Sequence, residues 1–177
     1  MPLKQALIFA AGPGPRLKPW TDEHPKALVQ VNGKSLLQRN IEYLQQYGIR
    51  DVIVNVHHFA GHIVDEVNKT GGWGSNVRIS DETDGLLRTG GGLKHASGYF
   101  HPDNPFVVMN VDMLTNLDLN KMLAFHELLM DVFFERLLHE EPDLLDRFGD
   151  FADDLPDHFC RMVDLAVRGL QDRKSVV

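Results

Sequence analysis

The sequence predicts an α/β fold with a mostly parallel sheet. Over residues 1–127, short apolar strands alternate with amphipathic helices, the pattern of successive βαβ units. The first strand is a continuous apolar run, typical of strands that are covered on both faces. Polar segments, several of them rich in glycine, follow the strands, so we expect the polar segments to meet at one edge of the sheet.

The first elements follow from local patterns. A strand is expected over 6–11, where the run Ala-Leu-Ile-Phe-Ala-Ala stops at a glycine. Four prolines exclude a regular helix from the loop over 12–31. Ser35 then caps a helix that runs to about Gln46, and Gly48 stops it. The later elements continue the alternation: strand 51–56, helix 60–68, strand 77–80, helix 93–97 opened by Thr-Gly-Gly-Gly, and strand 106–111.

The segments after the four strands are candidates for a ligand site. They are the loops 12–26, 57–58 and 81–92, together with Asp112 after the last strand. In open parallel sheets, ligands bind beyond the carboxyl ends of the strands. The adjacent His57 and His58 point to opposite sides of a strand end, so they make a poor chelating pair. A packed or hydrogen-bonded histidine is favoured over a metal site there.

The loop 12–26 has the composition of a phosphate-binding loop. Gly12 and Gly14 let backbone N–H groups approach a polyphosphate closely. Arg16 offers a bidentate donor for phosphate oxygens, and Lys26 is a natural second cation. The loop matches neither a Walker A motif nor the dinucleotide fingerprint.

At this point a family resemblance is clear. Residues 8–31 resemble the sugar-1-phosphate nucleotidyltransferase signature L-A-A-G-x-G-T-R-L-x-P-x-T-x-x-x-P-K-x-L-x-x-V. The similarity continues through NVHHFAGHI, ISDETDGLLRTGGGL and NVDM, and covers about residues 3–127. It is strongest to the N-acetylmuramate-1-phosphate uridylyltransferase and mannose-1-phosphate guanylyltransferase-like members. The resemblance implies a Rossmann-like sheet, the N-terminal half of the nucleotide-diphospho-sugar transferase fold.

The resemblance also implies a reaction and a set of roles. A sugar 1-phosphate attacks the α-phosphorus of an NTP, either UTP or GTP, to form an NDP-sugar and pyrophosphate. Arg16 would stabilise the pyrophosphate, Lys26 would contact the α-phosphate region, and Asp112 would ligate Mg²⁺. The remaining nucleotide-binding positions would be Ala11, Gly12, Gly14, Glu82, Thr89, Gly90, Gly91 and Asn110.

The chain departs from the family pattern in three places. Pro13 and Pro15 replace varied residues and a usual threonine, and Pro15 removes one backbone N–H from the loop. Arg88 replaces a common acidic residue and adds positive charge near the base pocket. After residue 127 the family pattern stops, so we expect the acceptor-sugar half and a second metal-binding aspartate to be missing.

Residues 128–177 are expected to form an acidic helical tail, separate from the nucleotide-binding region 1–127. The tail has 12 Asp/Glu and 6 Lys/Arg, a net charge of −6, against −1 from 13 and 12 in residues 1–127. Apolar residues recur at helical spacing from Phe159 to Leu170. The tail weakly resembles the early helices of bacterial globins, but the helix with the haem-ligating histidine is absent and no haem is expected.

Two functional hypotheses remain open, together with a remote third. The chain is an active nucleotidyltransferase completed by other groups, or a truncated or chimeric nucleotide-binding module with little or no activity. The third hypothesis makes the tail the functional part, as a helical oligomerisation or globin-fragment unit. A homo-oligomer could form through the tail or the exposed sheet edge.

Composition limits where the protein works and what it binds. With Cys160 as the only cysteine and no apolar run of roughly 20 residues, we expect a cytoplasmic protein without a membrane segment. The acidic tail argues against nucleic-acid partners, because phosphates would repel it.

Overall fold

The computed structural model describes residues 3–101 and 104–128, and the chain divides into two compact units. The first unit runs to Asn116 and the second starts at Leu117. In the second unit, residues 119–128 are helical, and Asp118 Oδ1 accepts hydrogen bonds from the backbone N–H groups of Asn120 and Lys121. The helices expected after residue 128 lie outside the described residues, and the expected boundary near residue 127 stays a prediction.

The first unit is built on a four-stranded parallel sheet, as expected. The strands are β1 (Gln5–Phe9), β4 (Asp51–Val56), β5 (Asn76–Asp81) and β6 (Phe106–Asn110), in the order β5-β4-β1-β6. β1 pairs with β4 on one side, with Gln5 opposite Asp51, and with β6 on the other. The bounds of β4 agree with expectation, and those of β1, β5 and β6 differ from it by at most two residues. Directly after β1, the Ala10 N–H donates both to Asn55 Oδ1 at 2.7 Å and to the Asn55 carbonyl at 3.2 Å.

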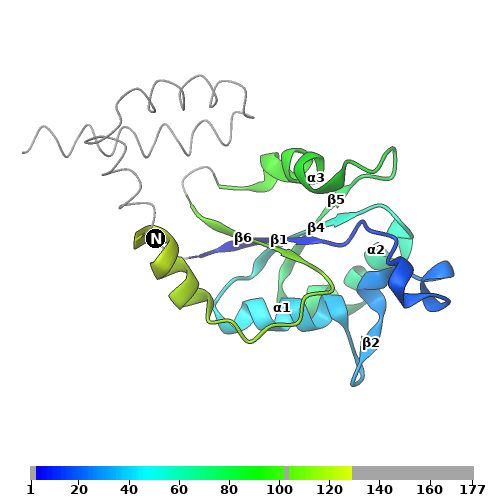
Figure 1. Cartoon of the computed structure of the whole chain (residues 1–177), viewed down its shortest axis with the longest axis horizontal. Coiled ribbons are helices and arrows are strands. Elements are labelled where there is room, and N and C mark those ends of the chain that lie inside the picture. Colours follow the sequence, from blue (N-terminus) through cyan, green and yellow to red (C-terminus); the bar gives the residue numbers. More distant parts are fainter. Residues whose placement is uncertain (1–2, 102–103, 129–177) are drawn as a thin grey trace, which may run out of the picture. The chain divides into compact units, whose positions relative to one another are not determined.

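Helices cover both faces of this sheet, with α1 (Leu36–Gln46) and α2 (Ala60–Thr70) on one face and α3 (Arg88–Ala96) on the other (Figure 1). Ser35 caps α1 as expected, since its Oγ accepts from the Gln38 N–H at 3.1 Å. The inward face of α1 carries Leu37, Ile41 and Leu44, each fully buried. On the α3 face, Leu7, Ile53, Ala96 and Phe100 form a buried cluster.

Two local structures differ from the sequence-based expectation. α3 begins at Arg88, not after the glycines, so Gly90, Gly91 and Gly92 lie inside the helix, where Gly91 and Gly92 approach neighbouring atoms closely. The loop after β1 contains the 3₁₀ turns η1 (Pro15–Leu17), η2 (Trp20–Asp22) and η3 (Lys26–Leu28).

That loop leads into an unexpected hairpin of β2 (Gln30–Val31) and β3 (Lys34–Ser35). Its turn residues Asn32 and Gly33 both have positive φ, the signature of an Asn-Gly hairpin turn. The short 3₁₀ segments η4 (Gly71–Gly74) and η5 (Ser97–Tyr99) complete the first unit. No helix among the described residues is long and apolar enough to cross a bilayer.

Candidate functional site at the carboxyl edge of the sheet

The strand order creates a topological switch point beside β1. From β1 the chain moves to β4 and β5 on one side, then returns to β6 on the other. Because all pairings are parallel, the segments after the four strands emerge at the same edge of the sheet (Figure 1). The loops after β1 and β6 flank the position where open α/β sheets bind ligands. This is the arrangement expected from the sequence.

The loop after β1 folds around the side chain of Lys26. Gly14 adopts a left-handed conformation (φ 60°, ψ 51°), and its carbonyl accepts a hydrogen bond from Thr21 Oγ1 at 3.0 Å. A Cβ on Gly14 would lie 3.0 Å from Lys26 Cβ and 3.2 Å from Lys26 Cγ and Cδ. Gly14 therefore supplies both the positive φ and the room for the lysine stem.

Lys26 and Asp112 form an ion pair across the switch point. The distance from Lys26 Nζ to Asp112 Oδ2 is 3.2 Å, and the two side chains are 14% and 34% exposed. A Cβ on Gly12 would lie 3.9 Å from the same Nζ, so the lysine head also faces the start of the loop. Two candidate residues separated widely in sequence are thus brought together beside a glycine-bearing backbone.

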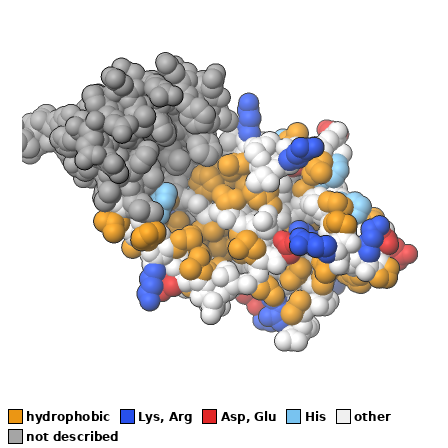
Figure 2. All heavy atoms as spheres, in the orientation of Figure 1, with side chains coloured by type: hydrophobic (Ala, Val, Ile, Leu, Met, Phe, Trp, Pro, Cys, Tyr) orange, Lys and Arg blue, Asp and Glu red, His pale blue; other side chains and the backbone are white. Residues whose placement is uncertain are grey.

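The other candidate residues after β1 and at the end of β6 differ in exposure. Arg16 lies in η1, is exposed, and forms no ion pair within the described part of the chain. Asn110 is the last residue of β6, is exposed, and lies opposite Phe9 of β1. Ala11 is buried and Gly12 half-buried directly after β1. Figure 2 shows Lys, Arg and His side chains gathered at the side of the unit from which the loop after β1 projects.

Glu82 is buried and fully engaged by the protein itself. It is 3% exposed. Its Oε1 accepts from Asn55 Nδ2 at 2.9 Å, and its Oε2 accepts from the Leu87 N–H at 3.1 Å. Asn55 Oδ1 in turn accepts from the Ala10 N–H. The carboxylate therefore braces the loop after β5 against the ends of β4 and β1, and its role in nucleotide binding stays a prediction.

The glycines of α3 serve different purposes. A Cβ on Gly92 would lie 2.6 Å from Glu82 Oε1 and 2.9 Å from Asn55 Nδ2, so this position must lack a side chain for the brace to form. A Cβ on Gly91 would lie 2.8 Å from Leu87 Cβ, whereas one on Gly90 would meet no atom within 4 Å. Thr89 and Gly90 are exposed, and their binding role stays a prediction.

Charged and polar side chains at the rim are ordered by local hydrogen bonds. His57 Nδ1 lies 2.6 Å from the Glu82 carbonyl oxygen, which fits the expectation of a hydrogen-bonded histidine. Hydrogen bonds from Thr83, backbone N–H first, lower the pKa of the Asp81 carboxyl below its usual value. Asp81 therefore remains charged beside His57.

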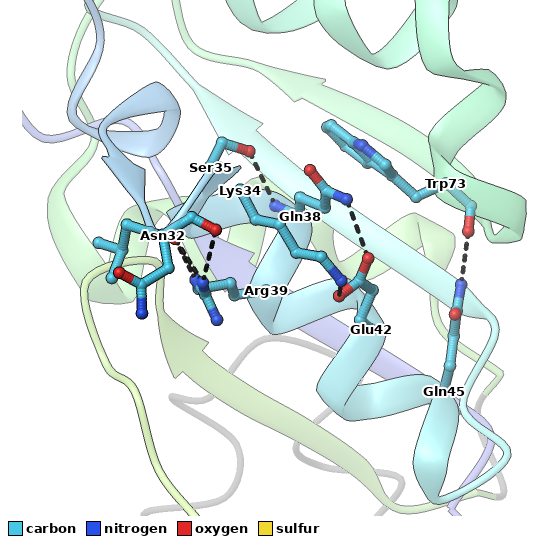
Figure 3. Close-up of polar contacts among 9 residues, drawn as sticks. Asn32, Lys34, Ser35, Gln38, Arg39, Glu42, Gln45 and Trp73 are labelled. Atoms are coloured by element: carbon cyan, nitrogen blue, oxygen red, sulfur yellow. Dashed lines mark hydrogen bonds and ion pairs between the residues drawn. The ribbon is translucent and has the colours of Figure 1, made fainter.

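The hairpin that leaves the loop is fastened to α1 (Figure 3). The Arg39 guanidinium donates to the Val31 carbonyl through Nε at 2.8 Å and also through Nη2. Lys34 Nζ lies 2.6 Å from Glu42 Oε2, and Gln38 Nε2 donates to Glu42 Oε1 at 2.9 Å. The hydrogen bond from Lys34 is the main reason that the pKa of Glu42 lies below its usual value.

Sequence reasoning did not single out two buried amides at this edge. Asn55 joins β1 to Glu82, and Asn40 on α1 donates to the Val111 carbonyl at 2.7 Å. Each side chain is 2% exposed. The available signal was an asparagine inside an otherwise apolar strand or helix face, because buried amides need partners.

Known proteins share this arrangement. The model of the nucleotidyl transferase family matches residues 5–139. The chain is 37% identical to an N-acetylmuramate alpha-1-phosphate uridylyltransferase of Caulobacter vibrioides, over 63% of this chain and 46% of that protein. It is 33% identical to mannose-1-phosphate guanyltransferase 2 of Candida glabrata, over 70% of this chain and 34% of that protein.

A solved structure is similar to this chain in both sequence and fold. HddC from Yersinia pseudotuberculosis, complexed with GMP-PN, superposes with a TM-score of 0.61 at 33% identity, covering 69% of this chain and 53% of HddC. The chain thus spans about half the length, or less, of the relatives it matches. With the parallel sheet, the loop after β1 and the match over residues 5–139, the chain belongs to the nucleotidyl transferase family.

Proposed function

We propose that this chain supplies the nucleotide-binding part of a cytoplasmic, Mg²⁺-dependent sugar-1-phosphate nucleotidyltransferase. The reaction joins the phosphate oxygen of a sugar 1-phosphate to the α-phosphorus of an NTP, and the bond to pyrophosphate breaks. The observation that carries the proposal is the Lys26–Asp112 ion pair beside Gly12 and Gly14 at the switch point. It places one cation and one carboxylate where a triphosphate would meet the loop backbone.

The residues at this edge fit a divalent cation that arrives with its nucleotide. Among the described residues, no group of three or more His, Cys, Asp or Glu side chains could hold a metal alone. Mg²⁺ does not need such a group, because one or two carboxylates, substrate phosphates and water complete its shell. Asp112, partly exposed beside Lys26, has the chemistry for that contact. The bound cation would neutralise phosphate charge.

The protein's own contribution is positioning and charge. Backbone N–H groups of the glycine-containing loop would bind phosphate oxygens, as in other anion sites. Lys26 would be drawn from Asp112 to the α-phosphate region, and the exposed Arg16 would stabilise charge on the leaving pyrophosphate. The buried Glu82–Asn55 link would keep the loop before α3 in place beside the base.

A second candidate function is nucleotide binding without turnover. The matched region makes up 46% of the uridylyltransferase and 34% of the guanylyltransferase, and it contains the loop after β1 and the Lys26–Asp112 ion pair. The loop after β1 and the Lys26–Asp112 ion pair would bind the nucleotide whether or not the chain also catalyses the transfer. Both UTP and GTP are candidate nucleotides, since the relatives include uridylyl- and guanylyltransferases.

Two measurements test the proposal. First, melting temperatures are measured with UTP, GTP, CTP and dTTP in the presence of Mg²⁺. At least one NTP should raise the melting temperature, and Arg16→Ala or Lys26→Ala should abolish the shift. Lys69→Ala is the matched control, because Lys69 lies on α2 with a side chain 78% exposed. No shift with any NTP would refute the binding claim.

Second, pyrophosphate release is measured with a panel of sugar 1-phosphates and each NTP. Release that disappears in Asp112→Asn supports the enzyme. A thermal shift without any release supports the binding module.

A further inference from the structure

Asn40 is a buried amide inside the apolar face of α1. It lies among Leu37, Ile41 and Leu44 and is 2% exposed. An amide buried without a hydrogen bond is costly, so a polar side chain at such a position needs a defined partner. The partner of Asn40 Nδ2 is the carbonyl oxygen of Val111, at 2.7 Å and 71 residues away.

Val111 is the residue directly before Asp112. It follows the last residue of β6 and is fully buried. Its N–H donates to the Phe9 carbonyl at 3.0 Å, and the Met113 N–H closes a turn onto the Asn110 carbonyl at 3.0 Å. The carbonyl of Val111 belongs to the peptide group that begins Asp112. Asn40 therefore fixes the plane of the peptide from which the Asp112 side chain departs.

The helix that carries Asn40 is itself held at both ends (Figure 3). Ser35 caps its first turn, and Arg39 binds the hairpin carbonyl of Val31. Near its other end, Gln45 Nε2 donates to the Trp73 carbonyl at 2.9 Å and to Ser75 Oγ at 2.8 Å. Asn40 itself lies on the buried face of α1, with Leu37, Ile41 and Leu44. The amide is thus presented to β6 from an anchored element.

We infer that Asn40 is a positioning residue, which orients Asp112 for the metal–nucleotide complex through the Val111–Asp112 peptide. The inference rests on the proposed function. When the Asn40 donor is lost, the peptide before Asp112 can rotate and the carboxylate is no longer held over the switch point. Residues that orient a metal ligand from behind typically change metal affinity about 10- to 100-fold.

The experiment compares two amides of the same helix. Asn40→Leu keeps the approximate size and removes the donor to the Val111 carbonyl. Gln45→Leu removes a donor to a different backbone carbonyl, that of Trp73, and is the matched control. Mn²⁺, a paramagnetic substitute for Mg²⁺, is titrated by electron paramagnetic resonance at saturating concentration of the NTP that gives the largest melting shift. Nucleotide affinity is measured separately without metal.

The expected result separates positioning from general stability. Asn40→Leu should weaken Mn²⁺ binding by about 10-fold or more, whereas Gln45→Leu should leave it unchanged. Metal-free nucleotide affinity should be the same in both variants and the wild type. Asn40→His, which keeps a donor close to the position of Asn Nδ2, should restore most of the Mn²⁺ affinity. If Asn40→Leu does not fold, Asn40→Ser tests the same loss with a hydroxyl too short to reach the carbonyl.

The experiment distinguishes a failure of the inference about Asn40 from a failure of the proposed function. If Asn40→Leu (or Asn40→Ser in its place) binds Mn²⁺ as tightly as the wild type does, the inference about Asn40 is wrong. The proposal that the chain binds a nucleotide is not affected by that result. The inference is also wrong if Gln45→Leu loses as much Mn²⁺ affinity as Asn40→Leu. A wild type that gives no melting shift with any NTP would overturn the proposed function, and the inference with it.

Discussion

Replacing Gly92 by alanine should destabilise the protein through a single methyl group. The new Cβ would lie 2.6 Å from Glu82 Oε1, 2.9 Å from Asn55 Nδ2 and 3.3 Å from Phe9 Cε1. The first two contacts are far inside van der Waals range and the third is slightly too close, and Glu82 and Asn55 are 3% and 2% exposed. The carboxylate would have to move, and its hydrogen bond to Asn55 would be strained or lost.

The magnitude follows from three effects. Forcing an extra carbon into a packed site costs about 1–3 kcal/mol. Losing a hydrogen bond to a charged group costs a further ~1.5–3 kcal/mol. Alanine in place of glycine inside a helix contributes about 1 kcal/mol in the opposite direction. The free energy of unfolding should therefore fall by about 2–4 kcal/mol.

Gly90 provides the matched control in the same helix. A Cβ there would meet no atom within 4 Å, and the residue is exposed. Gly90→Ala should raise the free energy of unfolding by about 0.5–1 kcal/mol, the helix-propensity gain alone. Both variants are measured by urea denaturation without ligand, with far-UV circular dichroism as the signal. If Gly92→Ala proves as stable as Gly90→Ala at equal m-value, the buried Glu82–Asn55 brace does not exist as described.

Two further predictions concern the anchoring of α1. Ser35→Ala should lower the free energy of unfolding by about 1 kcal/mol, because it removes the cap bond to the Gln38 N–H; an unchanged urea midpoint would contradict that bond. Glu42 has a pKa below its usual value, so its ion pair with Lys34 stabilises the protein at neutral pH, and this stabilisation is lost as pH falls through the folded-state pKa. Glu42→Gln should therefore cost at most about 0.5–1 kcal/mol at neutral pH, since the pair is partly exposed, and nothing in acid. The measurement is the difference in free energy of unfolding between Glu42→Gln and the wild type. If this difference stays constant from neutral to acidic pH, the Glu42–Lys34 ion pair is not its cause.

The sheet and its edge were predictable because they depend on regular patterns. A continuous apolar run predicted β1, the alternation of short strands with helices predicted the other three strands, and parallel pairing then placed Lys26 and Asp112 at one edge. The cap at Ser35 was predictable from a single residue type, since it precedes an apolar run with helical spacing.

The missed features depend on contacts between distant residues. The start of α3 at Arg88 was missed because glycine is a weak helix former, and only packing on Glu82 and Asn55 explains a glycine at position 92. The hydrogen bonds that Asn55 and Leu87 donate to the Glu82 carboxylate were not predicted either, and the pocket-lining role of Glu82 stays a prediction. The partner of Asn40 lies 71 residues away, and local periodicity carries no information about such a pair.

The central place of β1 has a consequence for synthesis on the ribosome. β1, β4 and β5 can assemble as soon as residue 81 has emerged, because their pairings lie within the first part of the chain. The second side of β1 then waits for β6, in which Phe106 pairs with Gln5. During that interval the nascent chain presents an unpaired edge and a Lys26 without Asp112, so it is exposed to wrong pairings. The binding edge is completed last, when the peptide of Val111 reaches Asn40.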